Sequence, residues 1–413
     1  MGKYPISGRI RGISGKSMLS RGNRIRNQMI RRVIRQSIFL VFVLILASIL
    51  WGMSMESAPP EISGKWAEVL KLPSGELTEY VRKHPLHLKN VLLKRESISR
   101  SEISKAIFDN VYWDDSYAQN ALILNAKFNG GVIYDTSFAN SHLVGAVFDH
   151  VFMDKGEFVG AKLDNVVFKN CDIVNSEIRN LHDSRFRIEN CEIRDTNFFQ
   201  SKMDLEIVNS KGYEGLDFGE ALPGSTILIK NSYIGPYSVF SKAEFDSFVI
   251  ESSRLEKVDG GDMTIRSVSV KDSEARIDFG GGDYQRMVFY NSKYAILWES
   301  RIGSLSIVNY NPGERVDLEK VKADKVNVRD STINVALVKD AAINEIYLTN
   351  TELAALDLRN ARIRKLVLQN VKVTGKADLS HLVVEDLVVH GLEIAPNAVL
   401  NLEGSTVRPE QLR

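Results

Sequence analysis

Cysteine and histidine are scarce in this chain of 413 residues, which has two cysteines and seven histidines. Only His84 and His87 are close in sequence, and Pro85 between them disrupts the helical spacing that suits a pair of metal ligands. The two cysteines, Cys171 and Cys191, have no other ligand-type residues in register with them. The sequence therefore predicts no metal site, no cofactor and no catalytic residues, and we expect a protein that is not an enzyme.

Acidic residues are absent from residues 1–36, which contain ten lysines or arginines. No charged residue occurs in the next segment, 37–55, whose nineteen largely apolar residues are enough for one membrane span. A cleaved signal peptide is the alternative, but the long basic leader and the lack of a small-x-small site favour an uncleaved anchor. Because positive charge stays on the cytoplasmic side, we expect a single-pass protein of the bacterial inner (cytoplasmic) membrane whose C-terminal part is periplasmic.

The basic tail, 1–36, has a second expected role at the membrane surface. Apolar residues between positions 25 and 34 fall on one face of a helix, and five arginines lie among them: Arg24, Arg26, Arg31, Arg32 and Arg35. This pattern favours a basic amphipathic helix on anionic lipid. The alternative is a solvated run that only orients the membrane span. Nucleic-acid binding is not expected, because aromatic residues do not accompany the arginines.

A repeat of about twenty residues organises the rest of the chain. Each repeat contains a small or apolar residue, any residue and an apolar residue, often followed two positions later by Asn or Asp. Sixteen such triplets occur at intervals of 18 to 22 residues, beginning at Leu86, Ala106, Ala126, Ala146, Val166, Phe186, Leu205, Ile227, Phe248, Val268, Met287, Leu305, Val326, Ile346, Leu366 and Leu387. A fixed period in this range is typical of a solenoid whose units contact only their neighbours.

Between residues 121 and 180 the repeat divides into fives. Apolar residues recur at every fifth position from Ile123 to Ile178, and a small residue usually stands two positions before each. A period of five fits neither an α-helix nor a simple strand, but it fits a chain that turns a corner every five residues. Four such sides close one square coil of twenty residues, with the apolar side chains filling its interior.

Residues 121–180 resemble the pentapeptide-repeat family, whose pattern is A-[DN]-[LF]-x-x. Ala126-Lys127-Phe128 and Ala161-Lys162-Leu163 match it at the first and third places, and their second place holds an outward Lys. The resemblance implies an all-β solenoid, a right-handed, four-sided parallel β-helix of about 16 coils. It extends over 86–203 and is weaker over 204–391, where one side per coil keeps a clear pattern. A three-sided coil of about eighteen residues is the local alternative there.

Asparagine recurs at one corner of the predicted coil, and two interpretations stay open. The amides could form a ladder from coil to coil, or Asn could simply suit the turn. Cys171 and Cys191 stand one coil apart and are predicted to point inward. We expect two buried thiols, with a disulfide as the alternative, because parallel stacking leaves their β-carbons too far apart for a relaxed bond.

The two ends of the solenoid are expected to be covered, because strand edges are otherwise exposed there. Segment 56–85 is predicted to be a linker followed by a helical N-terminal cap, and 392–413 a C-terminal cap. Outside the basic tail, 43 basic residues face 52 acidic ones, a net charge of −9. This mildly acidic balance favours solubility and gives no case for nucleic-acid binding.

The favoured function is a non-enzymatic, membrane-anchored scaffold that binds other envelope proteins in a secretion, motility or cell-wall machine. The candidate contact residues are four aromatic side chains, with ordinary packing as the alternative for each: Tyr112, Tyr134, Tyr294 and Trp298. A second hypothesis is a β-helix that binds or cleaves polysaccharide. A third is a self-associating rod that forms filaments.

Overall fold

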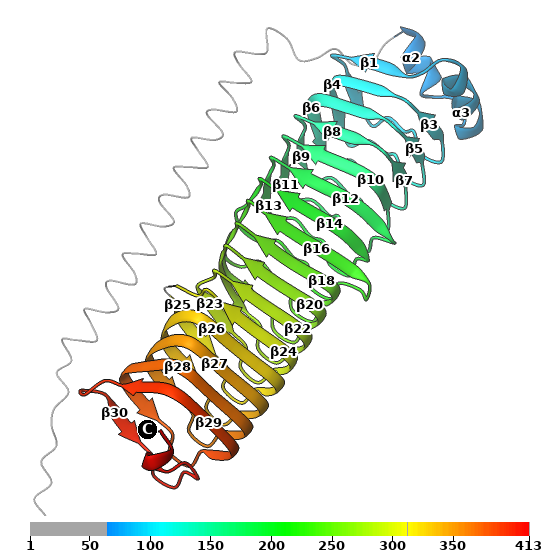
Figure 1. The fold of residues 1–413 in the computed structure, drawn as a ribbon. Helices are drawn as coiled ribbons and strands as arrows, with labels where there is room; N and C mark the ends of the chain where they lie inside the picture. Colours follow the sequence, from blue (N-terminus) through cyan, green and yellow to red (C-terminus); the bar gives the residue numbers. More distant parts are fainter. Residues whose placement is uncertain (1–63, 312, 413) are drawn as a thin grey trace, which may run out of the picture. The chain divides into compact units, whose positions relative to one another are not determined.

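The computed structural model describes residues 64–311 and 313–412. Two helices, α2 (Gly64–Val69) and α3 (Ser74–Lys83), precede thirty strands of one continuous sheet, and a short 3-10 helix, η1 (Pro409–Leu412), ends it. The described part is a β-solenoid whose coils stack along one axis (Figure 1). None of its helices has the length and hydrophobicity that a bilayer crossing requires. The predicted basic tail, 1–36, and transmembrane helix, 37–55, lie outside the described residues.

The first half of the solenoid has short strands, usually two or more to a coil. They are β1 (His87–Lys89), β2 (Leu92–Lys94), β3 (Glu102–Ser104), β4 (Ile107–Asp114), β5 (Leu122–Leu124), β6 (Lys127–Tyr134), β7 (His142–Val144), β8 (Val147–Asp149), β9 (Phe152–Asp154), β10 (Lys162–Lys169), β11 (Asp172–Val174), β12 (Ser184–Glu189), β13 (Glu192–Arg194), β14 (Met203–Val208) and β15 (Lys211–Gly212).

The second half has longer strands toward its end. They are β16 (Ser225–Lys230), β17 (Tyr233–Ile234), β18 (Glu244–Glu251), β19 (Arg254–Asp259), β20 (Thr264–Lys271), β21 (Glu274–Asp278), β22 (Asp283–Tyr290), β23 (Tyr294–Ile296), β24 (Arg301–Val308), β25 (Gly313–Asp317), β26 (Lys322–Leu337), β27 (Ala342–Asp357), β28 (Arg362–Asp378), β29 (Val383–Ile394) and β30 (Val399–Asn401).

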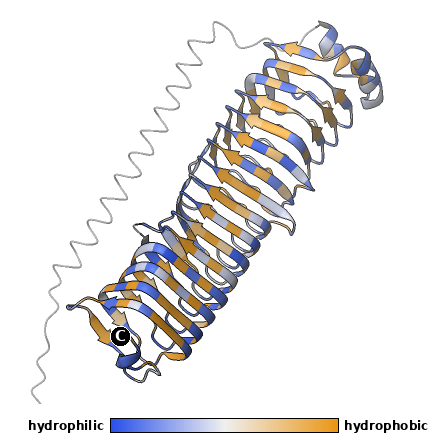
Figure 2. Ribbon diagram, in the orientation of Figure 1, coloured by the Kyte–Doolittle hydropathy of each residue, from blue (hydrophilic) through white to orange (hydrophobic). Residues whose placement is uncertain are grey.

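Every strand pairing is parallel, and each links a residue to its counterpart one coil later. Leu88 pairs with Phe108, Phe108 with Phe128, and Ile346 with Leu366. The sixteen triplets of the sequence stack in this way, so the predicted parallel solenoid of about sixteen coils is confirmed. Apolar and polar residues alternate along the strands (Figure 2), because one set fills the coil and the other faces water.

Aromatic side chains stack along the inside of the solenoid from the early coils to the middle ones. The ring centroids of Phe128 and Phe148 are 4.3 Å apart with the planes nearly parallel, and Phe168 continues this stack at 4.8 Å. A second stack on another side joins Phe218 to Phe240 at 4.5 Å. The stacking follows from the coil repeat, because identical residues at identical positions are held about one strand spacing apart.

A left-handed backbone conformation makes the corners. Every fifth residue from Asn90 to Asn180 has a positive φ, between 47° and 69°. Asn, Asp and Gly occupy most of these positions, since they adopt this conformation at least cost. The corner does not interrupt the sheet, because its N–H still bonds to the next coil: Asn90 N donates to the Asp109 carbonyl at 3.0 Å, and Asn190 N to that of Val208.

The asparagines of one corner also bond to each other through their side chains. Asn370 donates to the Asn350 carbonyl oxygen at 3.1 Å, and Asn350 donates to Asp330 at 2.9 Å. Asn110 donates to Asn90 in the same way at 3.0 Å. Both interpretations of the recurring Asn therefore hold together, because residues with the required φ also form a coil-to-coil ladder.

The five-residue pattern persists farther than the sequence suggests. From Val321 to Val373, buried residues occur in pairs two apart, and each pair begins five residues after the last. Positive φ recurs only every ten residues there, from Lys320 to Asn370, so a strand such as β26 runs through the corner between. Four sides per coil are thus kept, and the three-sided alternative is wrong for this region. In the sequence this pattern is hard to recognise, because large residues such as Ile346 stand where the family pattern has Ala.

The coils between residues 204 and 317 are the most irregular in length, and register also shifts once on either side of them, at Asp164/Val166 and Leu353/Ala355. Pairing shifts register between Ser225 and Thr226 and between Leu255 and Val258. Buried tyrosines fill the interior in two places, and their hydroxyls need acceptors: Tyr284 donates to the Phe279 carbonyl, and Tyr310 to that of Arg315. The two buried tyrosines occur in the region in which the coil length changes.

Both cysteines are buried and free, as predicted. They belong to an inward ladder in which a side chain accepts a hydrogen bond from the backbone one coil earlier. Cys171 N donates to Cys191 Sγ at 3.2 Å, and Cys191 N donates to Ser210 Oγ at 3.1 Å. The same link joins Ser210 N to Ser232 Oγ. The thiols thus take the place of serine hydroxyls in the core, where the hydrogen bond to Cys191 and burial raise the pKa of Cys171.

The two ends differ from one another. Helices α2 and α3 lie on the first coils, and Leu77 and Val81 of α3 are buried. At the other end, β29 continues to Ile394 and β30 pairs with β28. The predicted start of the C-terminal cap, residue 392, lies within β29, so the sheet continues past it.

Substitution of Asn350 separates the two roles of the corner asparagine. Asn350→Ala should lower the free energy of unfolding by about 2 kcal/mol, because alanine at positive φ costs roughly 1 kcal/mol and two ladder bonds are lost. Asn350→Gly keeps the φ and should cost about half as much. Urea unfolding followed by circular dichroism measures both, and a glycine variant less stable than the alanine variant would contradict this account.

Adjacent glycines provide a second test. An added β-carbon at Gly131 would lie 2.2 Å from the Val111 carbonyl oxygen, and φ there is +89°. Gly131→Ala should therefore destabilise the chain by about 2 kcal/mol or more. The matched control is Gly130→Asn, because an added β-carbon at Gly130 meets no atom within 4 Å and its φ of +67° is one that Asn tolerates. Thermal unfolding should show a large shift for the first variant only; equal shifts would be inconsistent with the corner geometry.

Candidate interaction surfaces

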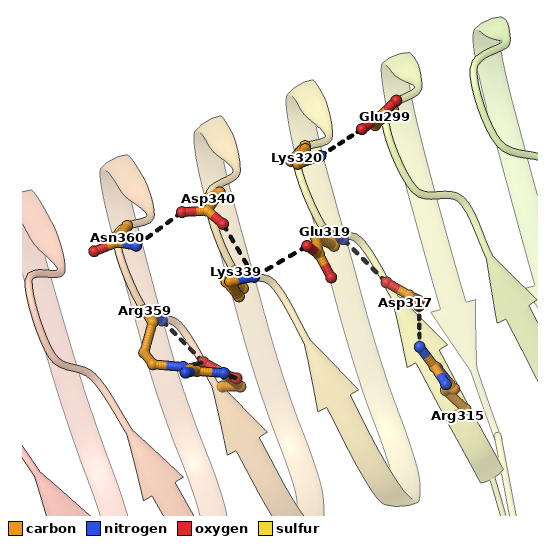
Figure 3. A network of polar contacts seen from close by, with 10 residues as sticks. Glu299, Arg315, Asp317, Glu319, Lys320, Lys339, Asp340, Arg359 and Asn360 are labelled. Atoms are coloured by element: carbon orange, nitrogen blue, oxygen red, sulfur yellow. Dashed lines mark hydrogen bonds and ion pairs between the residues drawn. The ribbon is translucent and has the colours of Figure 1, made fainter.

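Most of the outer surface is polar and crossed by ion pairs between coils. Lys320 contacts Glu299 at 2.6 Å, and Lys339 contacts both Glu319 and Asp340 (Figure 3). The hydrogen bond from Asn360 lowers the pKa of Asp340, and Lys339 adds to this effect. Exposed pairs of this kind contribute little stability each. They define a solvated surface rather than a binding site.

One column of outward residues is apolar over four successive coils. Leu92 pairs with Tyr112, Tyr112 with Val132, and Val132 with Phe152. Phe152 is 41% exposed, and Tyr134, which follows Val132 by two residues, is 38% exposed. We call these five residues the apolar strip. In the next two coils the same column holds Asp172 and then Glu192, so the strip is confined to the N-terminal end of the solenoid.

Acidic side chains border the apolar strip. Asp114 and Asp154 are paired with Tyr134 from either side, and Asp115 and Asp135 form the adjoining corner. Two of these carboxylates have basic partners on the first coil: Arg95 contacts Asp115 at 3.0 Å, and Lys94 contacts Asp114 at 4.0 Å. On the other side, Lys155 lies 5.1 Å from the ring centroid of Tyr134 and donates a hydrogen bond to its hydroxyl at 3.2 Å. The apolar strip is therefore a hydrophobic surface with a margin of mixed charge.

A wider depression of about 710 Å³ crosses β10, β12, β14, β16 and β18. Its outward column runs Val167, Arg187, Glu206, Leu228 and Val249. The Arg187–Glu206 ion pair, at 3.2 Å, divides the apolar residues into two groups. The depression thus lacks the continuous hydrophobic surface of the apolar strip.

A polar groove of about 520 Å³ crosses β19, β21, β23 and β25, where the coils are irregular. Tyr294 lies in it, with the Arg276 guanidinium 4.6 Å from the ring centroid. Arg276 donates to the Tyr294 hydroxyl, which donates to Glu314. Burial and the hydrogen bond to Glu314 raise the pKa of Tyr294. The side chains of Arg276, Tyr294 and Glu314 are thus joined by hydrogen bonds.

The carboxylates of the polar groove are also engaged locally. Asp259 and Asp278 pair on neighbouring strands. Asp278 accepts hydrogen bonds from Gly280 N and from Trp298 Nε1, at 2.9 and 2.7 Å, and Asp259 accepts one from Gly261 N. These bonds fix the turns after the strands. No cluster of three or more His, Cys, Asp or Glu side chains that could hold a metal occurs in residues 64–311 and 313–412.

The four predicted contact residues fall into two separate groups. Tyr112 and Tyr134 lie together in the apolar strip, on the second and third coils. Tyr294 and Trp298 lie at the polar groove on the eleventh coil, eight coils or roughly 40 Å away. Tyr294 is only 8% exposed, whereas Trp298 is 39% exposed. The five tail arginines, Arg24 to Arg35, lie outside the described residues.

Three residues of the apolar strip are not among the predicted contacts. Leu92, Val132 and Phe152 stand at twenty-residue spacings from Tyr112, on the outside of the coil. That spacing is the signal that finds them once the register is known. The pattern of inward residues alone does not identify these three residues.

No protein-family model and no curated protein matches this sequence. Two structures of trypsin-treated QnrB1, described as a plasmid-mediated fluoroquinolone resistance protein, match at 15% and 18% identity with TM-scores of 0.26 and 0.19. They cover 48% and 58% of this chain and 90% of each matched chain. HetL, a pentapeptide repeat protein involved in heterocyst differentiation regulation from the cyanobacterium Nostoc sp. strain PCC 7120, matches at 8% identity with a TM-score of 0.19, covering 78% and 94%.

The spacing of corners and buried residues shows how many sides each coil has. Residues with left-handed φ recur every five positions from Asn90 to Asn180, buried pairs recur every five from Val321 to Val373, and each strand pairs with its counterpart about twenty residues on. A coil therefore has four sides of five residues. The described solenoid thus has the four-sided parallel β-helix that the resemblance to the pentapeptide-repeat family implies.

Proposed function

We propose that this protein is a non-catalytic scaffold, anchored in the bacterial cytoplasmic membrane by the predicted helix 37–55, that binds another envelope protein through the apolar strip. The observation that carries the proposal is the column Leu92, Tyr112, Val132 and Phe152, which is continuous over four coils and ends abruptly at Asp172. A contiguous apolar surface on a largely polar exterior is typical of a protein-binding site.

The composition of the apolar strip suits a protein partner. Tyr and Phe are enriched at the centres of protein interfaces, where rigid rings bury a large area at low entropic cost. The margin presents carboxylates such as Asp135 and Asp154 together with the ammonium of Lys155, so it fits a partner whose apolar contact residues are flanked by charges of both signs. The strip lies on the first four coils, the part of the solenoid that is nearest in sequence to the predicted anchor.

A non-catalytic role fits the chemistry of the polar groove. Its carboxylates accept hydrogen bonds from neighbouring backbone and Trp298, and its arginine and tyrosine are paired. General acid–base catalysis requires a group free to exchange a proton with substrate. A polysaccharide ligand is the second candidate, favoured by the exposed Trp298 beside this groove.

Site-specific photo-crosslinking in living cells tests the proposal. A photoreactive residue at Phe152 should yield one defined adduct with an envelope protein, and Tyr112→Lys in the same chain should reduce that adduct about tenfold, because a charge would enter the apolar contact. The control position is Tyr237, an aromatic residue that is 62% exposed on the eighth coil.

Equal crosslinking at Phe152 and Tyr237, or an adduct unaffected by Tyr112→Lys, would contradict binding at the apolar strip. The absence of any adduct would favour the polysaccharide candidate instead, which binding of glycans to the membrane-extracted full chain then tests.

A further inference from the structure

Charge is distributed unevenly along the chain that follows the predicted anchor. Residues 64–105, which form helices α2 and α3 and the first coil, contain nine lysines or arginines and five acidic residues, a net charge of +4. Residues 106–413 contain 34 basic and 45 acidic residues, a net charge of −11. The solenoid is therefore positive at its N-terminal end and negative over the rest of its length.

Three of the four corners of the first coil are basic. Arg95, Arg100 and Lys105 have φ between 56° and 60°, in the left-handed region. The corresponding corners of the second coil hold one Asp and two Asn, which adopt this conformation at lower cost. The first coil thus keeps cations at corners where the backbone favours other side chains. A local conflict of this kind is expected where a residue serves function rather than folding.

The basic residues of this end are all exposed. Four of them have acidic partners between 3.0 and 4.0 Å away, and surface pairs of this kind are weak. The other five form no ion pair within residues 64–311 and 313–412. We call all nine the basic end, of which the first four are paired and the last five are not: Arg82, Lys83, Lys94, Arg95, Lys65, Lys71, Lys89, Arg100 and Lys105.

A flat anionic surface fits the basic end. The three corner cations stand around one coil, so a ligand on one side of the solenoid meets at most two of them. A plane that meets the solenoid end on meets all three, and it also meets helix α3, which lies at this end and carries Arg82 and Lys83 (Figure 1). The headgroups of an anionic bilayer form such a plane, and each Lys or Arg near it favours association about fivefold.

We propose that the basic end binds the anionic surface of a phospholipid bilayer, so that the solenoid stands upright on the membrane. The acidic remainder of the solenoid is repelled by the same surface, which also favours the upright orientation. The inference goes beyond binding at the apolar strip and rests on the proposed anchor only for bringing the two surfaces together. The predicted span ends at residue 55, and the chain from there to Gly64 extends at most about 30 Å.

The thickness of the protein layer on a supported bilayer tests the orientation. The full chain is reconstituted in phosphatidylcholine with or without phosphatidylglycerol and measured by neutron reflectometry at low salt. Sixteen upright coils should give a layer of about 75 Å on the anionic bilayer. On neutral bilayers, or at high salt, the layer should be thinner because the rods tilt freely. Equal thickness on anionic and neutral bilayers at low salt would overturn the proposal.

Two corner substitutions separate lipid binding from folding. Arg100→Asn combined with Lys105→Asn gives these corners the residue that the second coil has there. The melting temperature should rise, because Asn suits the positive φ. The increase in thickness caused by phosphatidylglycerol should nevertheless fall by at least about half, because two unpaired cations are lost.

The matched control removes the same charge from corners far from the basic end. Lys242 and Lys257 are exposed, at φ of 58° and 51°, on the middle coils. Lys242→Asn combined with Lys257→Asn should raise the melting temperature similarly and keep the full response to phosphatidylglycerol. Equal loss of that response in both double variants, or no loss in the first, would refute the assignment to the basic end.

Two further readouts separate the possible failures. Carbonate extraction tests the anchor alone: a wild-type chain that carbonate removes contradicts the anchor of the proposed function, whereas the layer thickness still decides the role of the basic end. Dextran sulfate tests a soluble polyanion as the partner. Binding of dextran sulfate that Arg100→Asn with Lys105→Asn abolishes, together with equal layers on both bilayers, would assign the basic end to a polyanion and overturn the membrane proposal.

Discussion

The left-handed corner residue is the constraint on which the whole structure depends. It turns the chain every five residues from Asn90 to Asn180 and at every second corner from Lys320 to Asn370. Its N–H continues the sheet to the next coil, as the bond from Asn190 N to the Val208 carbonyl shows. Because the turn is made by one residue, each side of the coil is short and only two side chains per side point inward. The interior is therefore a repeated set of stacked positions, filled by Phe, Ile, Leu and small residues.

A uniform interior leaves the outer columns free to vary. Each outward position is repeated about every twenty residues. A column is therefore uniformly apolar or uniformly charged only where several successive coils carry side chains of the same kind. The apolar strip from Leu92 to Phe152 is such a column, and the ion pairs around Lys339 are another. The polar groove at Tyr294 arises differently, from coils whose length and register change. Differences between parts of the chain are therefore found on these outer surfaces, and the repeated coils set the spacing between them.

Much of the solenoid is predictable from the sequence, because inward residues are constrained by packing. The strict fives between 121 and 180 give the square coil directly. The same spacing from Val321 to Val373 escapes detection, since Ile346 or Leu366 stands where Ala is expected and two of four corners lose their positive φ. Surface features are harder to predict, because water accepts almost any side chain. Tyr112 and Tyr134 are found as aromatics, but Phe152 and Leu92 are recognised only through register, and the burial of Tyr294 depends on its contacts with Arg276 and Glu314.

Amide hydrogen exchange of the full chain, resolved by peptide, tests most directly whether one continuous ladder of corner bonds joins all the coils. The account predicts slow exchange at corner amides along the entire series, at Asn90, Asn190 and Asn309 alike, because each donates to the following coil. The irregular region from 204 to 317 should be protected nearly as well as 121 to 180. Rapid exchange throughout the irregular region, with protection only on either side, would contradict a single stacked solenoid and indicate two separate ones.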